Sequence, residues 1–321
     1  MSGKEIEKIA VLGGGLIGAG WAVNFLWKGY PTAVYDVSEE ALEAARKRVS
    51  GSFDYLAAKG IVSADQARVA MGLARYTTDI AAALKDADLI QEAAPERYEV
   101  KRDLLAQVDR FAKEEAVFAS STSGLLISRI AEGSKHPERC LGAHPYNPPY
   151  LIPLVEISKG EKTAEEYLQR AYDFYRALGK EPIILRKEAL GFIANRISVA
   201  LYREAVDLVW RGVCSVADVD KAVTFGPGLR LALMGPNLIY QLGGGQYGVK
   251  GILHHIGPTV EDWWADMADW KKWPEGWGDM AQEGVLKEME ERPASQGRTP
   301  EEIARWRDDG LITLLRFHGK I

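Results

Sequence analysis

The sequence predicts an α/β domain with a doubly wound, mostly parallel sheet, followed by an all-α domain. Its 321 residues are more than one domain with a single hydrophobic core usually contains, and 47% of them are hydrophobic. In the first half, short β-branched or apolar runs alternate with longer helical patterns, as in βαβ units. Beyond Gly191 the strand signals fade and helical periodicity dominates. We place the boundary in the polar stretch 186–189, which gives domains of residues 1–188 and 189–321.

Seven short runs in the first domain are expected to be strands. They span residues 8–12, 32–35, 89–92, 117–120, 140–144, 154–157 and 182–185. Between the second and third strands, residues 39–73 predict two helices that are broken at Gly60, and the pair Ser63 and Gln66 caps the second one. This segment is longer than a crossover needs, so we expect an inserted helical hairpin.

Further helices are predicted by capping signals and apolar periodicity. The run from Thr163 to Glu166 predicts a capped helix that continues to about Leu178, before the last strand. In the second domain we expect helices over residues 192–211 and 215–223, then a glycine-rich connection, and a terminal helix capped at residues 299–302.

Composition excludes several function classes. The net charge of −5 gives no field that attracts nucleic acid or an anionic membrane. Cys140 and Cys214 lie outside any C-x-x-C spacing, so we expect no disulfide framework and no metal site, and a cytoplasmic setting is the default. The uncharged stretch 9–27 contains five glycines, which argues against a membrane helix.

A glycine-rich turn follows the first expected strand. The run Gly13-Gly-Gly15-Leu16-Ile17-Gly18 fits the G-x-G-x-x-G pattern, with an apolar helix after it. Gly13 would permit the tight turn, Gly15 the approach of a pyrophosphate, and Gly18 close packing of helix and strand. This context favours a Rossmann-type dinucleotide site over a glycine turn that binds nothing.

Asp36 ends the next strand at about the 20-residue spacing of that fingerprint. Its carboxylate would accept a hydrogen bond from a ribose 2′-hydroxyl, whereas a 2′-phosphate at about 4 Å would be repelled by about 4 kcal/mol at an effective dielectric of about 20. That energy corresponds to about a thousandfold in affinity. No arginine stands at Val37 or Ser38 to compensate, so NAD is expected rather than NADP.

His144 ends another expected strand, and Glu156 lies on the strand that follows. Histidine titrates near neutral pH, and a carboxylate on its far nitrogen would fix its tautomer and stabilise its protonated form. This pair suits alcohol oxidation. A lone histidine at a strand end is as often a structural residue, so the neighbouring sequence has to decide.

Four segments together resemble the 3-hydroxyacyl-CoA dehydrogenase family. They are Ser120-Ser-Thr-Ser123, His144-Pro-Tyr-Asn147-Pro, Glu156 and Gly191-Phe-Ile-Ala-Asn195-Arg. The resemblance covers the sheet domain and the start of the helical domain. It implies an NAD-dependent dehydrogenase that forms a homodimer through its helical domain.

The resemblance also implies roles for single residues. His144 would be the general base, Glu156 its orienting partner, and Ser123 and Asn195 would hydrogen-bond the reacting oxygen or the substrate carbonyl. The contacts to the nicotinamide ribose region would come from Glu96, Lys101, Ser123 and Asn147. In this mechanism His144 removes the proton of a 3-hydroxyl as hydride leaves C3.

Two residues of this chain differ from those usual in the coenzyme A enzymes of the family and bear on the substrate. Ser121 stands where those enzymes usually have asparagine, and Pro145 where they usually have phenylalanine. Both resemble the branch of lambda-crystallin, L-gulonate and carnitine dehydrogenases, which implies a small free 3-hydroxy acid. Arg230 is a candidate for its carboxylate, with a surface or interface salt bridge as an equal alternative.

The late sequence is rich in tryptophan, at Trp263, Trp264, Trp270, Trp273 and Trp277. A quaternary ammonium group such as that of carnitine would gain about 2 kcal/mol from a desolvated aromatic face. Tryptophans at this density are more often part of a core or a subunit interface.

Alternatives remain at this stage. Ser52 and Lys59 resemble coenzyme A contacts of the family, which would indicate a thioester substrate. A structural, crystallin-like protein and an NAD-binding regulatory module are the alternatives outside enzymes. Neither would require both His144 and Glu156.

Overall fold

The computed structural model describes residues 5–321, and their packing divides the chain into two units. The first runs to Arg196 and also includes Leu315–Ile321, and the second is Ile197–Leu314. The sequence places its domain boundary earlier, at residues 188/189, and assigns the last residues to the second domain.

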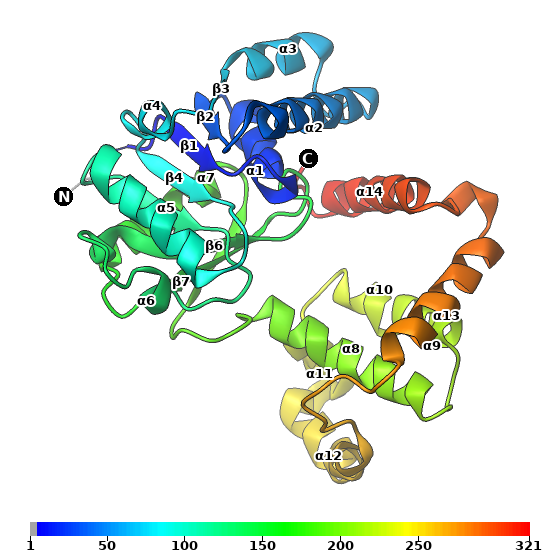
Figure 1. Ribbon diagram of the computed structural model, residues 1–321. Helices are drawn as coiled ribbons and strands as arrows, with labels where there is room; N and C mark the ends of the chain where they lie inside the picture. Colours follow the sequence, from blue (N-terminus) through cyan, green and yellow to red (C-terminus); the bar gives the residue numbers. More distant parts are fainter. Residues whose placement is uncertain (1–4) are drawn as a thin grey trace. The chain divides into compact units, whose positions relative to one another are not determined.

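The first unit contains one sheet of eight strands in the order β3-β2-β1-β4-β5-β6-β7-β8 (Figure 1). The strands are β1 (Ile9–Leu12), β2 (Thr32–Tyr35), β3 (Ala74–Thr77), β4 (Leu89–Glu92), β5 (Val117–Ser120), β6 (Cys140–Pro145), β7 (Leu154–Lys159) and β8 (Glu181–Leu185). Only the β6–β7 pair is antiparallel. The predicted doubly wound, mostly parallel sheet is confirmed, and its strand order reverses between β1 and β4, where such sheets bind ligands.

All seven predicted strands are present, and β3 is an eighth that the sequence did not indicate. β3 is an edge strand that pairs only with β2. None of its four residues is buried, so it has no apolar alternation to detect.

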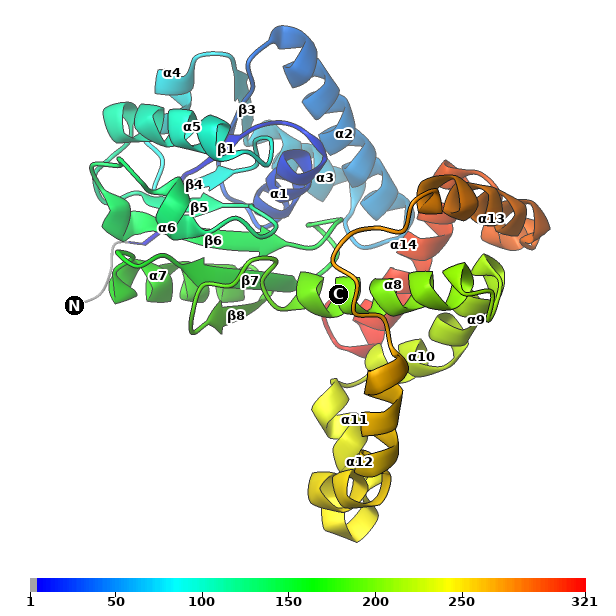
Figure 2. The same ribbon diagram turned by 60° about the horizontal axis from the view of Figure 1, so that its bottom comes forward.

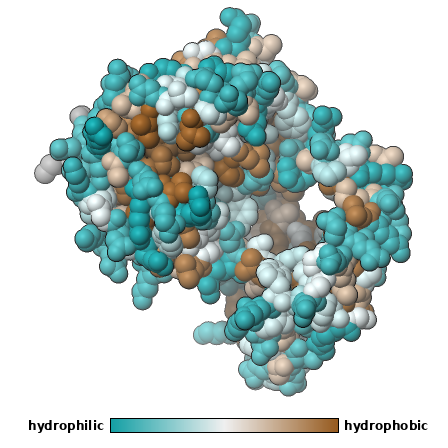
Figure 3. All heavy atoms as spheres, viewed as in Figure 1, coloured by the Kyte–Doolittle hydropathy of each residue, from teal (hydrophilic) through white to brown (hydrophobic). Residues whose placement is uncertain are grey.

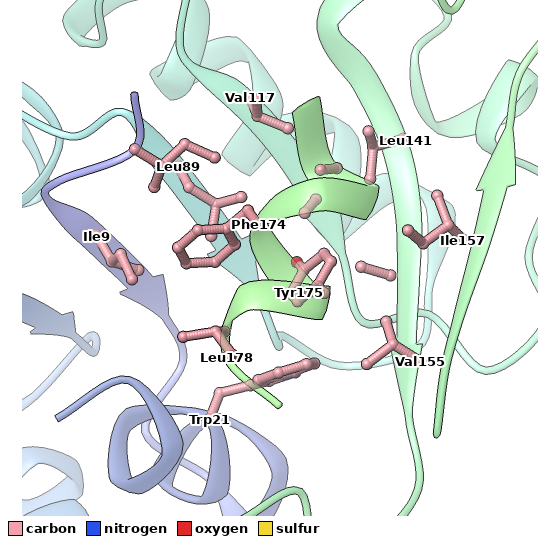
Figure 4. Close-up of a cluster of buried hydrophobic side chains, with 14 of the residues drawn as sticks. Ile9, Trp21, Leu89, Val117, Leu141, Val155, Ile157, Phe174, Tyr175 and Leu178 are labelled. Carbon is pink, nitrogen blue, oxygen red and sulfur yellow. The ribbon is translucent and has the colours of Figure 1, made fainter. Parts of the chain in front are cut away.

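Helices cover both faces of the sheet. One face carries α1 (Leu16–Trp27) and α7 (Glu165–Ala177), and the other carries α4 (Ile80–Leu84), α5 (Tyr98–Phe111) and α6 (Ile127–Ile130). A short 3₁₀ turn, η1 (Pro137–Arg139), precedes β6. Figure 4 shows Trp21 of α1 and Tyr175 of α7 among the strand side chains of the first face. This aromatic packing fixes α1, and so the glycine turn before it, against the sheet.

The inserted hairpin is confirmed as α2 (Glu39–Ala58) and α3 (Ala64–Gly72). The chain turns at Gly60, whose φ is 66°, and Ser63 and Gln66 form the predicted capping box.

The predicted cap at Thr163 is wrong. The N-cap of α7 is Ala164, which makes no side-chain bond to the helix. The Thr163 hydroxyl instead donates to the Cys140 carbonyl (2.5 Å) and accepts from the Gly160 amide (2.8 Å). It therefore secures the loop after β7 to the start of β6.

The second unit is all-helical, as predicted. Its helices are α8 (Ala194–Trp210), which begins in the first unit, α9 (Val216–Phe225), α10 (Pro227–Leu231), α11 (Pro236–Gly243), α12 (Gly248–Asp266), α13 (Trp277–Glu291) and α14 (Pro300–Phe317), which ends in the first. The 3₁₀ turns are η2 (Gly245–Tyr247) and η3 (Ala294–Gln296). The cap of α14 is confirmed, since the Thr299 hydroxyl accepts from the Glu302 amide (3.3 Å).

The expected glycine-rich connection is wrong, because this stretch forms α10 to α12. Figure 2 shows α11 and α12 side by side. Glycines and an internal proline, Pro258, interrupt the apolar periodicity of α12. Among residues 5–321, no helix has the length and apolar character needed to cross a membrane.

Candidate active site

The glycine turn between β1 and α1 has the close approaches that its pattern predicts. Gly13 has a φ of 100°, and a Cβ there would lie 2.8 Å from the Ala93 carbonyl oxygen. A Cβ on Gly18 would lie 1.8 Å from the Gly13 carbonyl oxygen. Both positions therefore require glycine, and the turn is held tightly against β4 and the first turn of α1.

The N-terminus of α1 is shaped to receive an anion. Its N-cap is Gly15, no side chain caps it, and its first turn holds no acidic residue. A Cβ on Gly15 would meet no heavy atom of another described residue within 4 Å, its chain neighbours and the adjoining helix backbone aside. The Leu16 side chain is 61% exposed, while the next residue, Ile17, packs against the core. Backbone N–H groups and the helix dipole favour negative charge at such an end. This space fits the pyrophosphate of a dinucleotide.

Asp36 lies beside this turn. Its Oδ2 accepts from the Gly14 amide (2.7 Å) and its Oδ1 from the Val37 amide (2.7 Å). Each carboxylate oxygen keeps a further lone pair, so the group remains able to accept from a ribose hydroxyl. Val37 is 80% exposed and brings no positive charge that would bind a 2′-phosphate.

A buried ion pair lies at the end of β4. Glu92 is fully buried and accepts from the Lys101 ammonium at 2.8 and 3.0 Å, and from the Ala94 amide (2.6 Å). The Ser120 hydroxyl also donates to Glu92, at Oε2. Lys101, which is 1% exposed, also lies 3.3 Å from Glu96. Sequence reasoning missed Glu92, although a charged residue at the end of a buried strand is a detectable signal.

Glu96 is bound to the turn that follows β5. Its Oε1 accepts from the Thr122 hydroxyl (2.6 Å) and from the Ser123 amide (2.8 Å). The structure thus brings together the predicted Glu96, Lys101 and Ser123, and Thr122 joins them as a residue that was not predicted.

His144 and Glu156 face each other across the antiparallel β6–β7 pair, where they are direct register partners. His144 Nδ1 lies 2.8 Å from Glu156 Oε2, and both side chains are buried. Glu156 Oε1 accepts from the Ile193 and Ala194 amides, at 2.9 Å each. Burial alone would raise the pKa of Glu156, but the hydrogen bonds from His144 and from the two amides outweigh it and lower the pKa. The carboxylate is therefore ionised and able to orient the imidazole.

Two aromatic rings enclose the imidazole. Phe192 and Tyr146 approach His144 edge-on, with ring centroids at 5.8 and 5.4 Å. Phe192 has a φ of 48°, in the left-handed region, and follows Gly191 with a φ of 73°. This backbone turns the chain so that Phe192 is buried against His144, while the Ile193 and Ala194 amides point at Glu156. Because of this turn, α8 begins at Ala194 and not at residue 192 as predicted.

Asn195 lies close to Ser123. The Asn195 Nδ2 group donates to the Ser123 carbonyl (2.8 Å), and its Oδ1 accepts from the Tyr146 hydroxyl (2.9 Å). The Ser123 side chain is exposed, and Asn195 is half-buried. The four predicted catalytic residues, His144, Glu156, Ser123 and Asn195, thus come from four chain segments that hydrogen bonds and ring contacts connect within the first unit.

Other predicted residues take no part in these contacts. Asn147 is exposed just beyond β6, and Arg230 is exposed on α10 in the second unit. The Ser52 hydroxyl donates to the Arg48 carbonyl of its own helix (2.9 Å). The structure shows no substrate role for any of them. Among the described residues no group of three or more His, Cys, Asp or Glu side chains could hold a metal ion.

The tryptophans of the second unit have two kinds of environment. Trp277 is buried with Val206, and Trp270 packs against the same cluster and donates to Asp207 (3.2 Å). Trp263 and Trp264, on α12, are 58% and 66% exposed. Only part of this set therefore forms the core of the unit.

Sequence reasoning missed Glu92, Thr122, Tyr146 and Phe192 as site residues. Their neighbours in the site lie up to 49 positions away in the chain, as for Tyr146 and Asn195. Tyr146 and Phe192 stood inside the recognised segments, so a search for hydrogen-bonding groups beside the histidine could have found Tyr146.

Comparison with known proteins identifies the family of the chain. The family model "3-hydroxyacyl-CoA dehydrogenase, NAD binding domain" matches residues 8–189, and the model of its C-terminal domain matches residues 191–302. An L-carnitine dehydrogenase from a Pseudomonas species is 40% identical, with 98% of this chain and 95% of that protein covered. An L-carnitine dehydrogenase from Oceanobacillus iheyensis is 37% identical, with 97% of both covered.

Among solved structures, 5-formyl-3-hydroxy-2-methylpyridine 4-carboxylic acid 5-dehydrogenase, described as an NAD⁺-dependent dismutase, superposes with a TM-score of 0.79 at 31% identity, covering 98% of this chain and 97% of that one. The two family models together span both units. The chain therefore belongs to the 3-hydroxyacyl-CoA dehydrogenase family and is an NAD-dependent oxidoreductase of the 3-hydroxyacyl dehydrogenase type.

Proposed function

We propose that this enzyme oxidises the 3-hydroxyl of a small free 3-hydroxy acid to the 3-oxo acid, with L-carnitine as the first candidate. The observation that carries the proposal is the buried His144–Glu156 pair, bonded at 2.8 Å and joined through Tyr146 and Asn195 to Ser123. The similar proteins named above support the substrate class, because their names refer to compounds with a free carboxylate.

In this proposal His144 is the general base. Its Nδ1 is engaged by Glu156, which leaves Nε2 to take the proton of the substrate hydroxyl. The ionised Glu156 stabilises the imidazolium that forms, and in the reverse direction the imidazolium returns the proton. NAD, when bound, supplies the hydride acceptor.

Ser123 and Asn195 are proposed to hold the reacting oxygen. The Ser123 hydroxyl is exposed, and the second N–H of the Asn195 amide is not used by Ser123. Donors aimed at an oxygen that gains negative charge stabilise the transition state.

The cofactor would be held by residues of the first unit. We assign the pyrophosphate to the turn Gly13 to Gly18 and the adenosine ribose to Asp36, with Glu96, Lys101, Ser123 and Asn147 toward the nicotinamide ribose. The contacts of Glu96 and Lys101 support this assignment, because they fix both groups beside the end of β4.

Substrate selection by the second unit is also part of the proposal. Arg230 would bind the carboxylate bidentately. A face of the exposed Trp263 or Trp264 would suit a quaternary ammonium group, and a subunit interface is the more frequent role of such tryptophans.

A substrate screen tests the proposal. The purified protein is mixed with NAD and with L-carnitine, gulonate, 3-hydroxybutyrate or 3-hydroxybutyryl-CoA, and NADH is followed by absorbance. We expect turnover of a free acid. Turnover of the thioester alone would replace the proposal by a 3-hydroxyacyl-CoA dehydrogenase, for which the Ser52 hydroxyl, bonded to its own helix, offers little support.

We also propose a cytoplasmic homodimer formed through the helical unit. Cys140 and Cys214 are both free, as expected in a reducing compartment. Figure 3 shows apolar residues at the surface of the molecule. On α10 and α11 the exposed large apolar side chains are Leu229, Leu231, Leu238, Tyr240 and Leu242. Apolar surface of this extent is typical of subunit contacts. Sedimentation equilibrium at micromolar concentration would show a dimer, and Leu238→Glu would reduce dimer formation.

A further inference from the structure

The Tyr146 hydroxyl has a partner that the proposed chemistry does not explain. It donates to Asn195 Oδ1 at 2.9 Å, from a residue whose ring already packs against His144. Tyr146 is half-buried and lies two residues after the catalytic histidine. One side chain thus contacts both the proposed base and a proposed substrate ligand.

The orientation of the Asn195 amide follows from its neighbours. A backbone carbonyl only accepts hydrogen bonds, so the Ser123 carbonyl, 2.8 Å away, requires the NH₂ end of the amide. The oxygen end must then face Tyr146, whose hydroxyl has to donate. Burial raises the pKa of Tyr146, and the charge of Glu156 raises it further, so the hydroxyl stays protonated at neutral pH.

We propose that Tyr146 is a positioning residue that fixes Asn195 as a hydrogen-bond donor to the substrate. The amide oxygen is turned toward Tyr146 and one N–H donates to Ser123, so the remaining N–H is the one donor of this amide left for a ligand. Asn195 therefore selects a substrate oxygen that accepts, such as a carboxylate, a carbonyl or the developing alkoxide. This inference rests on the proposed function, because it assigns Asn195 to that same site.

A double-mutant cycle tests the inference with L-carnitine and 3-hydroxybutyrate as substrates. Tyr146→Phe removes only the hydroxyl and is expected to lower kcat/KM by about 3- to 10-fold, the range for one neutral hydrogen bond. Asn195→Ala should lower it by about 100-fold, as for a lost donor to a charged oxygen. In the double variant we expect no further loss beyond Asn195→Ala, and the KM for NAD should not change in any variant.

Tyr175→Phe is the matched control. It also removes one tyrosine hydroxyl bond, to Gln91 at 2.5 Å, but from the core beneath the sheet. Its kcat/KM should stay within about twofold of the wild type. A larger effect of Tyr146→Phe would then come from the orientation of Asn195 and not from a general loss of stability.

The outcomes distinguish the two proposals. If the wild type oxidises none of the four screened substrates, the proposed function is overturned. The Tyr146–Asn195 bond is then tested by urea unfolding of the same variants, where we expect the losses of stability of the two single variants not to add in the double variant. In an active enzyme, a Tyr146→Phe variant with unchanged kcat/KM, or losses that multiply in the double variant, would overturn the inference.

Discussion

His144 is the residue on which the proposed chemistry depends most. Replacing it with glutamine keeps a polar side chain of similar reach but removes the titratable base. We expect turnover to fall by about 10²–10⁴-fold, the usual contribution of a general base. NADH binding, followed by its fluorescence, should be unchanged, and a His144→Gln enzyme with normal turnover would rule out the assigned role.

Asp36 sets the cofactor preference through its charge. Asp36→Asn keeps an oxygen for the Gly14 amide, 2.7 Å away, but removes the repulsion of a 2′-phosphate. The ratio of kcat/KM for NAD to that for NADP should therefore fall by up to about 10³-fold. Initial rates with each cofactor measure this ratio. An unaltered ratio would mean that another residue selects NAD.

At the scale of single residues, the sequence predicted the members of the site that belong to local motifs. The requirement for glycine at Gly18 was readable because it arises from Gly13, within six positions of the chain, whereas the approach of Gly13 to Ala93 was readable only through the whole G-x-G-x-x-G pattern. Glu92 and Tyr146 could have been noticed as polar residues at such motifs, but their roles depend on Lys101 and Asn195, partners that only the folded chain identifies.

Among the elements, the antiparallel pair β6–β7 determines the charge of Glu156. Its pKa is lowered in the folded protein from a usual value of 4.5, so its ionisation stabilises the fold above about pH 4.5. This stabilisation is lost as the pH falls through the lowered, folded-state pKa. Urea unfolding at several pH values should show the decline.

Glu156→Gln is the variant that isolates this contribution. We expect about 1–3 kcal/mol lower stability at neutral pH and a shallower decline below pH 4.5. Part of the decline should remain, because the pKa of Asp88 is also lowered: burial alone would raise it, but the hydrogen bonds from Lys113 and from the Lys8 and Glu7 amides outweigh that. A decline as steep as in the wild type would show that Glu156 does not contribute.

Element prediction succeeded where side-chain periodicity reflects burial, and failed where it does not. The buried strand β4 has four buried residues and was found within its observed bounds. The edge strand β3 has none, and α12 includes Pro258 and several glycines, so neither carries a regular apolar pattern. Thr163 resembled a cap in sequence, yet its hydroxyl is used by β6.

For the whole molecule, the segment Leu315–Ile321 belongs to the first unit although residues of the second precede it. Leu315 is 7% exposed, Arg316 donates to the Lys59 carbonyl (3.2 Å), and Lys320 pairs with Glu181. Deleting the segment should lower the melting temperature by about 5 °C, for a loss of about 2 kcal/mol. Differential scanning calorimetry measures the shift, and Lys320→Ala alone should change it by less than about 2 °C, because exposed ion pairs contribute little.

Because the chain returns to its first unit, that unit cannot be completed until the second has been synthesised. The ribosome makes residues 197–314 before the segment that completes the earlier unit. A nascent chain that has not reached Leu315 leaves the Lys59 carbonyl, at the end of α2, and Glu181 of β8 without Arg316 and Lys320. The nucleotide-binding unit therefore reaches full stability only after residues 315–321 have emerged and docked.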